Sequence, residues 1–182
     1  HRVLPSFPTR RSSDLTRLSH RNGDLVVVDI CQFQVCRDPS KVLVTYALGS
    51  CVAICIHDPA VPVAGMIHFM LPESKIDPAK AQARPGMFGD TGLPRLFQEF
   101  YAAGGKKNRL LCHLIGGAAT LDCAGHFNIG KRNIMLARKL FWKSGISIKK
   151  EDSGGGDSRT VYLAVDTGRL VVRRPGGKER EL

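Results

Sequence analysis

A series of short β-favouring segments in the first half of the chain constrains its fold more than any other sequence feature. Segments rich in valine and isoleucine, separated by Asp-Pro and glycine, are typical of strands joined by turns. The predicted strands cover residues 25–30, 42–46, 52–57 and 63–70. The first half of the chain is therefore predicted to form a sheet.

The second half combines two amphipathic helices with further strands. Apolar residues recur on one helical face within residues 92–103 and again within residues 128–143, a spacing that predicts two helices. We expect Asp90 or Thr91 to cap the first helix and glycines to end both. The remaining strands are predicted at residues 109–115, 146–149, 160–165 and 169–172.

Length and composition indicate an ordinary globular domain. Of the 182 residues, 43% are hydrophobic and 24% are charged, which excludes a collagen, a disordered polyelectrolyte and a membrane bundle. No apolar stretch approaches the roughly 20 residues that cross a bilayer, so we expect no direct membrane insertion. We assign residues 1–22 to a disordered or artefactual segment, 23–174 to a single domain, 175–182 to a tail and 72–90 to an exposed loop.

The chain is basic, with 27 Lys and Arg residues against 16 Asp and Glu residues. Such a charge favours acidic partners, which include nucleic acid, an anionic membrane and an acidic protein surface. Several of the cations fall near the two ends of the chain, where solvated termini explain them: Arg2, Arg10, Arg11, Arg17, Arg173, Arg174, Lys178 and Arg180. We find no aromatic stacking cluster and no basic recognition helix, so nucleic-acid binding is the weaker alternative.

Cysteine usage indicates a reducing cytosol, because the six cysteines form no C-x-x-C pair and no secretory leader precedes them. A zinc site built from Cys112, His113, Cys123 and His126 is an alternative use for two of these cysteines, together with two histidines. Their spacing lacks a close ligand pair at each end, as common zinc sites have. We therefore predict no metal and no other cofactor.

The candidate chemistry centres on Cys51, which follows Gly49 and Ser50 at an expected sharp turn. A hairpin turn centred between residues 59 and 60 places Cys51 opposite His68, where Cβ atoms are about 4.5 to 5.5 Å apart. A slip of one residue in register places the two side chains on opposite faces.

If Cys51 and His68 meet, the imidazole can accept the thiol proton, and the thiolate can attack a carboxamide. The N–H groups of the turn, including that of Cys51, then bind the oxyanion, and water hydrolyses the thioester. From the residues alone, the alternative is that Cys51 is an inert core residue. Cys55 is the better core candidate of the two.

These segments resemble the CheD family of chemoreceptor glutamine deamidases over about residues 23–174. The matching blocks occur in the family order: T-Y-A-L-G-S-C-V-A-I-C-I-H-D-P, G-M-I-H-F-M-L-P, I-G-G-A, F-N-I-G-K-R-N, E-D-S-G-G-G-D-S-R and D-T-G-R-L-V-V-R-R. The chain departs from the family pattern at Ile67 and Gly156 and over its first twenty residues. None of these departures falls on the proposed chemistry.

The resemblance implies that Cys51 is the nucleophile, that His68 is the base and acid, and that Thr45 orients the imidazole, with Gly49 and Ser50 supporting the turn. It implies cytoplasmic deamidation of selected glutamines in methyl-accepting chemotaxis receptors, which releases ammonia. It also implies binding to a CheC-type phosphatase, and the alternative function is such binding without catalysis.

The implied fold is an α/β (α+β) arrangement in which mixed β-sheets pack as a sandwich with two or more flanking helices. Deamidating toxins of the cytotoxic necrotizing factor type have a similar catalytic arrangement. The strand-rich first half and the two amphipathic helices agree with this fold.

Overall fold

Two five-stranded sheets, called here sheets A and B, are present in the computed structural model, which describes residues 24–119 and 128–182. Sheet A has the strand order β1-β3-β8-β9-β10, and sheet B has the order β2-β5-β4-β6-β7. The strands are β1 (Leu25–Val27), β2 (Gln32–Cys36), β3 (Val42–Leu48), β4 (Val52–Asp58), β5 (Val63–Phe69), β6 (Leu111–Gly116), β7 (Ile148–Ser153), β8 (Arg159–Ala164), β9 (Leu170–Arg173) and β10 (Glu179–Glu181).

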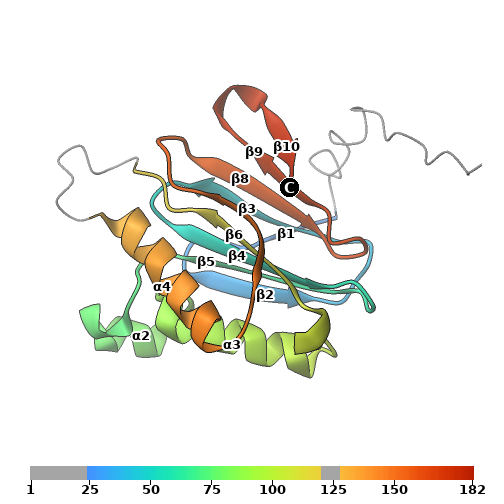
Figure 1. Ribbon diagram of the computed structural model, residues 1–182, viewed down its shortest axis with the longest axis horizontal. Coiled ribbons are helices and arrows are strands. Elements are labelled where there is room, and N and C mark those ends of the chain that lie inside the picture. The colour runs from blue at the N-terminus through green and yellow to red at the C-terminus, as the bar shows by residue number, and fades with distance from the viewer. Residues whose placement is uncertain (1–23, 120–127) are drawn as a thin grey trace, which may run out of the picture.

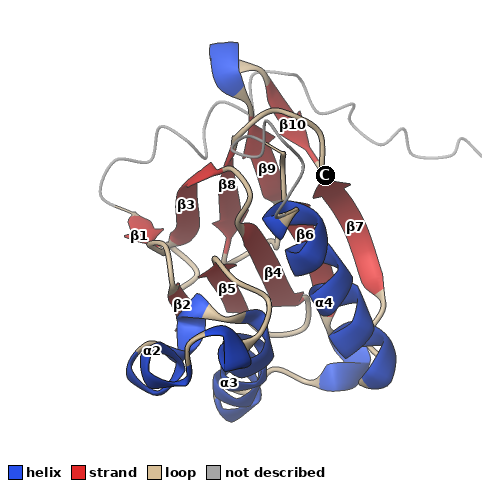
Figure 2. Ribbon diagram, turned by 90° about the vertical axis from the view of Figure 1, so that its left-hand side faces the viewer, coloured by secondary structure: helices blue, strands red, loops and turns tan. Residues whose placement is uncertain are grey.

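The structure has three layers, because sheet B packs against sheet A on one face and against helices on the other (Figures 1 and 2). The helices on that outer face are α3 (Gly89–Ala102) and α4 (Ile129–Lys143), and the short α2 (Pro78–Ala83) lies beside α3. Strand β4 is buried along its whole length. Its nearly continuous apolar sequence fits a central strand that is covered on both faces.

The predicted fold class is confirmed, and so are the positions of the main elements. Helix α4 matches the predicted helix to within one residue, and β4 and β5 each match to within one residue. Strand β2 was not predicted, because its sequence QFQVC carries few β-branched residues and it is partly exposed at the edge of sheet B. The first predicted strand is correspondingly shorter and ends at Val27.

The prediction of an exposed loop at residues 72–90 is wrong. This segment contains α2, two short 3₁₀ helices and the start of α3, and it buries Met87 and Phe88. Asp77 caps α2, because its side chain accepts a hydrogen bond from the Lys80 N–H. The helical period was hidden in the sequence because each helical piece is only a few residues long.

The predicted cap of α3 is also wrong. Phe88 occupies the N-cap position without a side-chain hydrogen bond to the helix. Asp90 instead accepts hydrogen bonds from Ser74, and the Thr91 hydroxyl donates to the Pro85 carbonyl. Both polar side chains thus attach the preceding segment to α3.

The C-terminal residues assigned to a tail form part of sheet A. Strand β10 pairs with β9 in antiparallel register, and Arg173 forms an ion pair with Glu179 across this pairing. Two of the cations attributed to solvated tails, Arg173 and Arg174, therefore have acidic partners in the fold. No helix of the described residues is long and apolar enough to span a membrane.

Strand β6 begins two residues later than predicted, because Arg109 belongs to a 3₁₀ turn at Lys107–Arg109. Its guanidinium donates to both carboxylate oxygens of Asp58, a fully buried side chain at the end of β4. These hydrogen bonds from Arg109 lower the pKa of Asp58 to about 2. The ion pair thus anchors the turn before β6 to the central strand.

Two buried histidines, His57 and His113, lie on neighbouring strands of sheet B. The Nε2–H of His57 donates to the Val165 carbonyl at 3.2 Å, and its Nδ1 has no hydrogen-bond partner within residues 24–119 and 128–182. Burial is the main cause that lowers the pKa of both imidazoles, that of His113 to about 4. Both histidines are therefore neutral in the folded protein near pH 7.

This burial predicts an acid-dependent loss of stability. In the unfolded chain the His113 imidazole takes up a proton below about pH 6.5, whereas in the folded protein it stays neutral down to about pH 4. The contribution of neutral His113 to the free energy of unfolding is therefore complete above pH 6.5 and is lost as the pH falls to 4. We expect His113 alone to contribute about 3 kcal/mol to this loss in the free energy of unfolding. Urea denaturation at a series of pH values measures it, with His113→Leu as the variant that should show a shallower dependence; identical slopes would contradict the assignment.

Candidate active site

The chain crosses from sheet A to sheet B between β3 and β4, and Gly49, Ser50 and Cys51 form this crossing. The register of the pairing between β3 and β8 shifts between Thr45 and Leu48, and Ala47 in this stretch has a φ of 54°. The irregularity interrupts the alternation of faces that a regular strand has. Thr45 and Leu48 are consequently both buried, and the chain leaves β3 in a turn that carries Cys51 at the base of β4.

The predicted register of the β4–β5 hairpin is wrong by two residues. His68 lies opposite Ala53 rather than Cys51, and Asp58 pairs with Val63. The predicted register places Pro62 inside the ladder, where a residue without an N–H cannot donate. In the structure Pro62 lies in the turn. Because a shift of two residues preserves the face, Cys51 and His68 remain on the same side of sheet B, in diagonal positions.

A hydrogen bond between the two sheets joins Thr45 to His68. Thr45 Oγ1 lies 2.8 Å from His68 Nδ1 and 2.7 Å from the Val28 carbonyl oxygen. Because a carbonyl only accepts, the single hydroxyl proton of Thr45 goes to Val28, and His68 Nδ1 must carry the proton that it donates to Thr45. The neutral imidazole therefore has an unprotonated Nε2.

The Nε2 atom of His68 is buried and has no hydrogen-bond partner among the described residues, Cys51 included. Burial lowers the pKa of His68 to about 4, against a weaker opposite effect of Asp29. Burial, with a smaller contribution from nearby Cys31, raises the pKa of the Cys51 thiol to about 11. The structure thus holds a neutral thiol and a neutral imidazole near pH 7, not a thiolate–imidazolium pair.

Cys51 in the crossing turn is 9% exposed, whereas Cys55 on β4 is completely buried, as expected of the better core residue. Within the described residues, the backbone N–H of Cys51 donates to no backbone carbonyl, and its interaction with the residue's own sulfur lowers the thiol pKa against the larger effect of burial. An N–H that no carbonyl engages, beside a partly accessible sulfur, is a suitable donor for an oxyanion that forms there.

The end of β6 and the residues that follow it hold the crossing turn in place. The N–H of Gly117 donates to the Cys51 carbonyl at 2.7 Å, and the N–H of Ala118 donates to the Gly49 carbonyl at 2.8 Å. Gly116 has a φ of 105°, and a Cβ there would lie 2.4 Å from the Cys51 carbonyl oxygen. In the sequence, Gly116 and Gly117 stood out only as part of the I-G-G-A block, which gave no hint of this contact.

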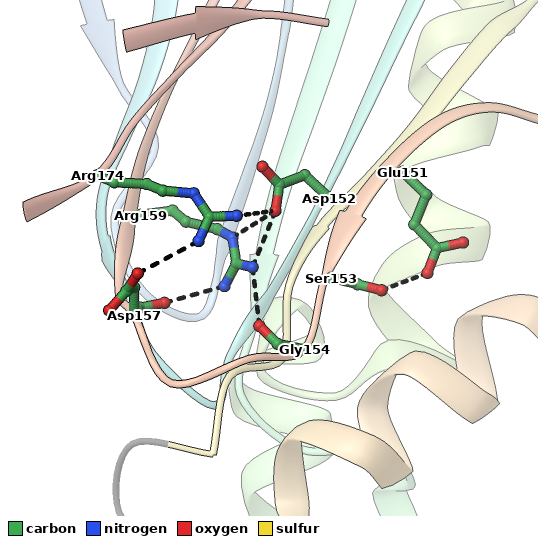
Figure 3. Close-up of polar contacts among 7 residues, drawn as sticks. All are labelled: Glu151, Asp152, Ser153, Gly154, Asp157, Arg159 and Arg174. Carbon is green, nitrogen blue, oxygen red and sulfur yellow. Dashed lines mark hydrogen bonds and ion pairs between the residues drawn. The ribbon is translucent and has the colours of Figure 1, made fainter. Parts of the chain in front are cut away.

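A buried ion-pair cluster fixes the loop after β7 (Figure 3). Asp152 accepts from the guanidinium groups of Arg159, at 2.9 Å, and Arg174, at 2.7 Å. Arg159 also donates to the carbonyls of Gly154 and Asp157. Sequence analysis recognised this segment only as the E-D-S-G-G-G-D-S-R block.

The fixed loop in turn supports the segment that holds Cys51. The Gly154 N–H donates to the Gly116 carbonyl at 2.9 Å, and the Ala119 N–H donates to the Gly155 carbonyl at 2.8 Å. The ion-pair cluster therefore acts on the crossing turn through the glycines after β6.

A cavity of about 580 Å³ lies beside the crossing turn. Ser50, the residue before Cys51, forms part of its wall, together with Ala118, Gly154 and the first half of α4. Lys131 and Arg138 of α4 also line it. The cavity therefore reaches the turn that carries Cys51, and of its two cations Arg138 forms an ion pair with Glu151.

The described residues contain no group of three or more His, Cys, Asp or Glu side chains placed to hold a metal ion. Cys112 and His113 are consecutive residues of β6, so their side chains point to opposite faces of the strand. Cys112 packs in the core between sheet B and the helices. Cys123 and His126, the other two candidate zinc ligands, lie outside the described residues.

The fold and site define a class of two-sheet protein in which a cysteine at a sheet-crossing turn and a histidine hydrogen-bonded to a threonine lie on the same face of one sheet. The chain belongs to the CheD family: the family description "CheD chemotactic sensory transduction" matches residues 70–174.

Relatives of this family match the chain over nearly their whole length. A protein of Syntrophus aciditrophicus named "Probable chemoreceptor glutamine deamidase CheD 1" is 48% identical over 88% of this chain and 99% of its own length. The "Probable chemoreceptor glutamine deamidase CheD" of Solibacter usitatus is 44% identical over 86% of this chain and 92% of its own. The "Chemoreceptor glutamine deamidase CheD" of Thermotoga maritima is 39% identical over 85% and 94%, respectively.

The neutral state of the thiol predicts how Cys51 reacts with iodoacetamide. Because only the thiolate is alkylated and the pKa of Cys51 is near 11, we expect the rate to rise about tenfold per pH unit between roughly pH 7 and 10. Mass spectrometry of the Cys51 peptide measures the rate, and N-acetylcysteine, whose rate levels off above about pH 9, serves as the reference. A rate that is already constant around pH 7 would show an ion pair and contradict this picture.

Proposed function

We propose that this protein is a glutamine deamidase that converts chemoreceptor glutamines to glutamates through a thioester on Cys51. Membership of the CheD family and the names of the relatives support the reaction and the substrate. The observation that carries the mechanism is the hydrogen bond from His68 Nδ1 to Thr45, because it leaves Nε2 free to accept a proton. No cofactor takes part in the proposed reaction.

The first half of the reaction acylates the enzyme. His68 Nε2 takes the thiol proton as the Cys51 sulfur attacks the carboxamide carbon, and the carbonyl oxygen becomes an oxyanion that the Cys51 N–H binds. The imidazolium then gives its proton to the leaving nitrogen, the C–N bond breaks, and ammonia departs. A thioester between the substrate side chain and Cys51 remains.

The second half of the reaction hydrolyses the thioester. Neutral His68 removes a proton from water as the water attacks the thioester carbon, and the C–S bond breaks. The proton returns to the sulfur, which leaves a glutamate side chain and restores the thiol. Throughout, the Thr45 hydroxyl keeps the imidazole in one tautomer and one orientation.

Thiolate formation is proposed to depend on the bound substrate. The free protein holds the neutral pair, because burial disfavours both the thiolate and the imidazolium. A carboxamide at the mouth of the site supplies the carbon that takes up the negative charge as it develops on sulfur. Proton transfer and attack are therefore expected to occur together.

The partner and the compartment follow from the same assignment. We propose that the cytoplasmic part of a methyl-accepting chemotaxis receptor is the substrate, and the free cysteines of the described residues suit that reducing compartment. A CheC-type phosphatase is the further partner that the family resemblance implies. Phosphatase binding without ammonia release is the alternative function.

The decisive experiment compares wild type with Cys51→Ala on a receptor cytoplasmic fragment. We expect wild type to release ammonia and to raise the fragment mass by about 1 Da for each glutamine, and Cys51→Ala to lower the rate by at least about 10³-fold. Cys55→Ala is the matched control, because it removes a neighbouring thiol that faces only the core. Equal deamidation by wild type and Cys51→Ala would remove Cys51 from the mechanism, and binding without ammonia release by wild type would favour the non-catalytic alternative.

Replacement of Thr45 by valine tests the orientation of His68. Valine keeps the volume but removes the hydroxyl that accepts from Nδ1, so the imidazole can adopt the wrong tautomer. We expect kcat to fall about 10²- to 10⁴-fold while the receptor KM changes little. Thr45→Ser, which keeps the hydroxyl, should retain most of the activity; equal losses in the two variants would mean that packing, not the hydrogen bond, is required.

A further inference from the structure

We infer that Asn133 is a positioning residue that fixes the distance between the turn carrying Cys51 and the strand carrying His68. The inference rests on the proposed function and adds a residue to its machinery. Asn133 lies on α4 and is completely buried. It belongs to the F-N-I-G-K-R-N block, for which sequence analysis gave no role.

The carboxamide of Asn133 connects two backbone segments that lie far apart in the sequence. Its Nδ2 group donates to the Ser50 carbonyl at 3.1 Å and to the Met70 carbonyl at 2.9 Å. Both acceptors are carbonyls, so the nitrogen of the side-chain amide must be the atom that faces them. Ser50 directly precedes Cys51, and Met70 follows His68 by two residues.

This link lies where the sheet stops connecting the same two segments. The last ladder pair between β4 and β5 joins Val52 to Phe69. Beyond that pair the chain of Met70 turns away, since its N–H donates to the Met87 carbonyl. Asn133 thus links the two segments beyond their last ladder pair, at the residue that precedes Cys51.

Packing alone does not explain an asparagine at this position. The surrounding face of α4 is apolar, with Ile134, Ala137 and Phe141 buried against sheet B. Asparagine is a poor helix former, and the buried Oδ1 of Asn133 has no hydrogen-bond partner in the part of the chain that the structure describes. An apolar residue of similar volume would avoid both penalties, so the value of Asn133 lies in its two N–H donors.

Their effect on catalysis follows from the geometry of proton transfer and attack. The sulfur must lie within reach of both Nε2 and the substrate carbon, and small displacements of reacting groups lower rates strongly. His68 is fixed from the sheet A side by Thr45. Asn133 supplies the corresponding constraint from the helix side, because it holds the backbone just before Cys51 and just after His68.

The test compares Asn133→Leu and Asn133→Asp with wild type on the receptor fragment. Leucine keeps the volume without the donors, and aspartate keeps the shape but presents oxygens to two carbonyls. We expect both variants to lower kcat about 10- to 100-fold, per folded molecule, with KM within about twofold of wild type. Circular dichroism at the assay temperature gives the folded fraction used for this correction.

The matched control is Phe141→Leu, a destabilising change on the same buried face of α4 that touches neither backbone segment. We expect it to lower the melting temperature while keeping kcat per folded molecule at the wild-type value. If Asn133→Leu keeps the wild-type kcat, or loses activity only in proportion to its folded fraction, the inference is overturned. If wild type itself releases no ammonia, the proposed function fails instead, so the two failures are distinguishable.

Discussion

The hydrogen bond between Thr45 and His68 is the interaction on which the site depends, because it crosses from one sheet to the other. A histidine between two packed sheets is tolerated only when it is neutral and at least one ring nitrogen is paired. Thr45 satisfies Nδ1 and passes its own proton to Val28, so the same bond satisfies a buried group and selects the tautomer. The sandwich and the site are therefore parts of one arrangement.

Around this bond, four segments meet that are separated in the sequence. The crossing turn carries Cys51, the end of β5 carries His68, the glycines after β6 receive the turn, and α4 supplies Asn133. The Asp152 cluster holds a further loop against those glycines. Most of these contacts are made by or to backbone atoms, so they specify the path of the chain more than the identity of each side chain.

The sequence predicted the sandwich class, the two main helices and most strands, because local periodicity and turn chemistry determine those features. It also led to Cys51, His68 and Thr45, although Thr45 was reached only through the family resemblance. The register of the β4–β5 hairpin was predicted wrongly because the predicted pairing placed Pro62, which has no N–H to donate, inside the ladder. Asn133 and Gly116 were missed because their importance lies in contacts with carbonyls far away in the chain, which no local pattern reports. For Asn133, the visible signal in the sequence was an asparagine on an otherwise apolar helical face.

The burial that makes the pair neutral also gives the site a form of selectivity. A permanently ionised thiolate reacts with oxidants and with many electrophiles, and irreversible oxidation destroys it. The Cys51 thiol is held mostly out of solvent and protonated, with the unpaired His68 Nε2 and its own N–H available on the proposed reaction path. On the proposed reaction path, charge separation is expected only when a carboxamide occupies the space where the oxyanion forms. A site of this kind suits an enzyme that must act on a few amides among many.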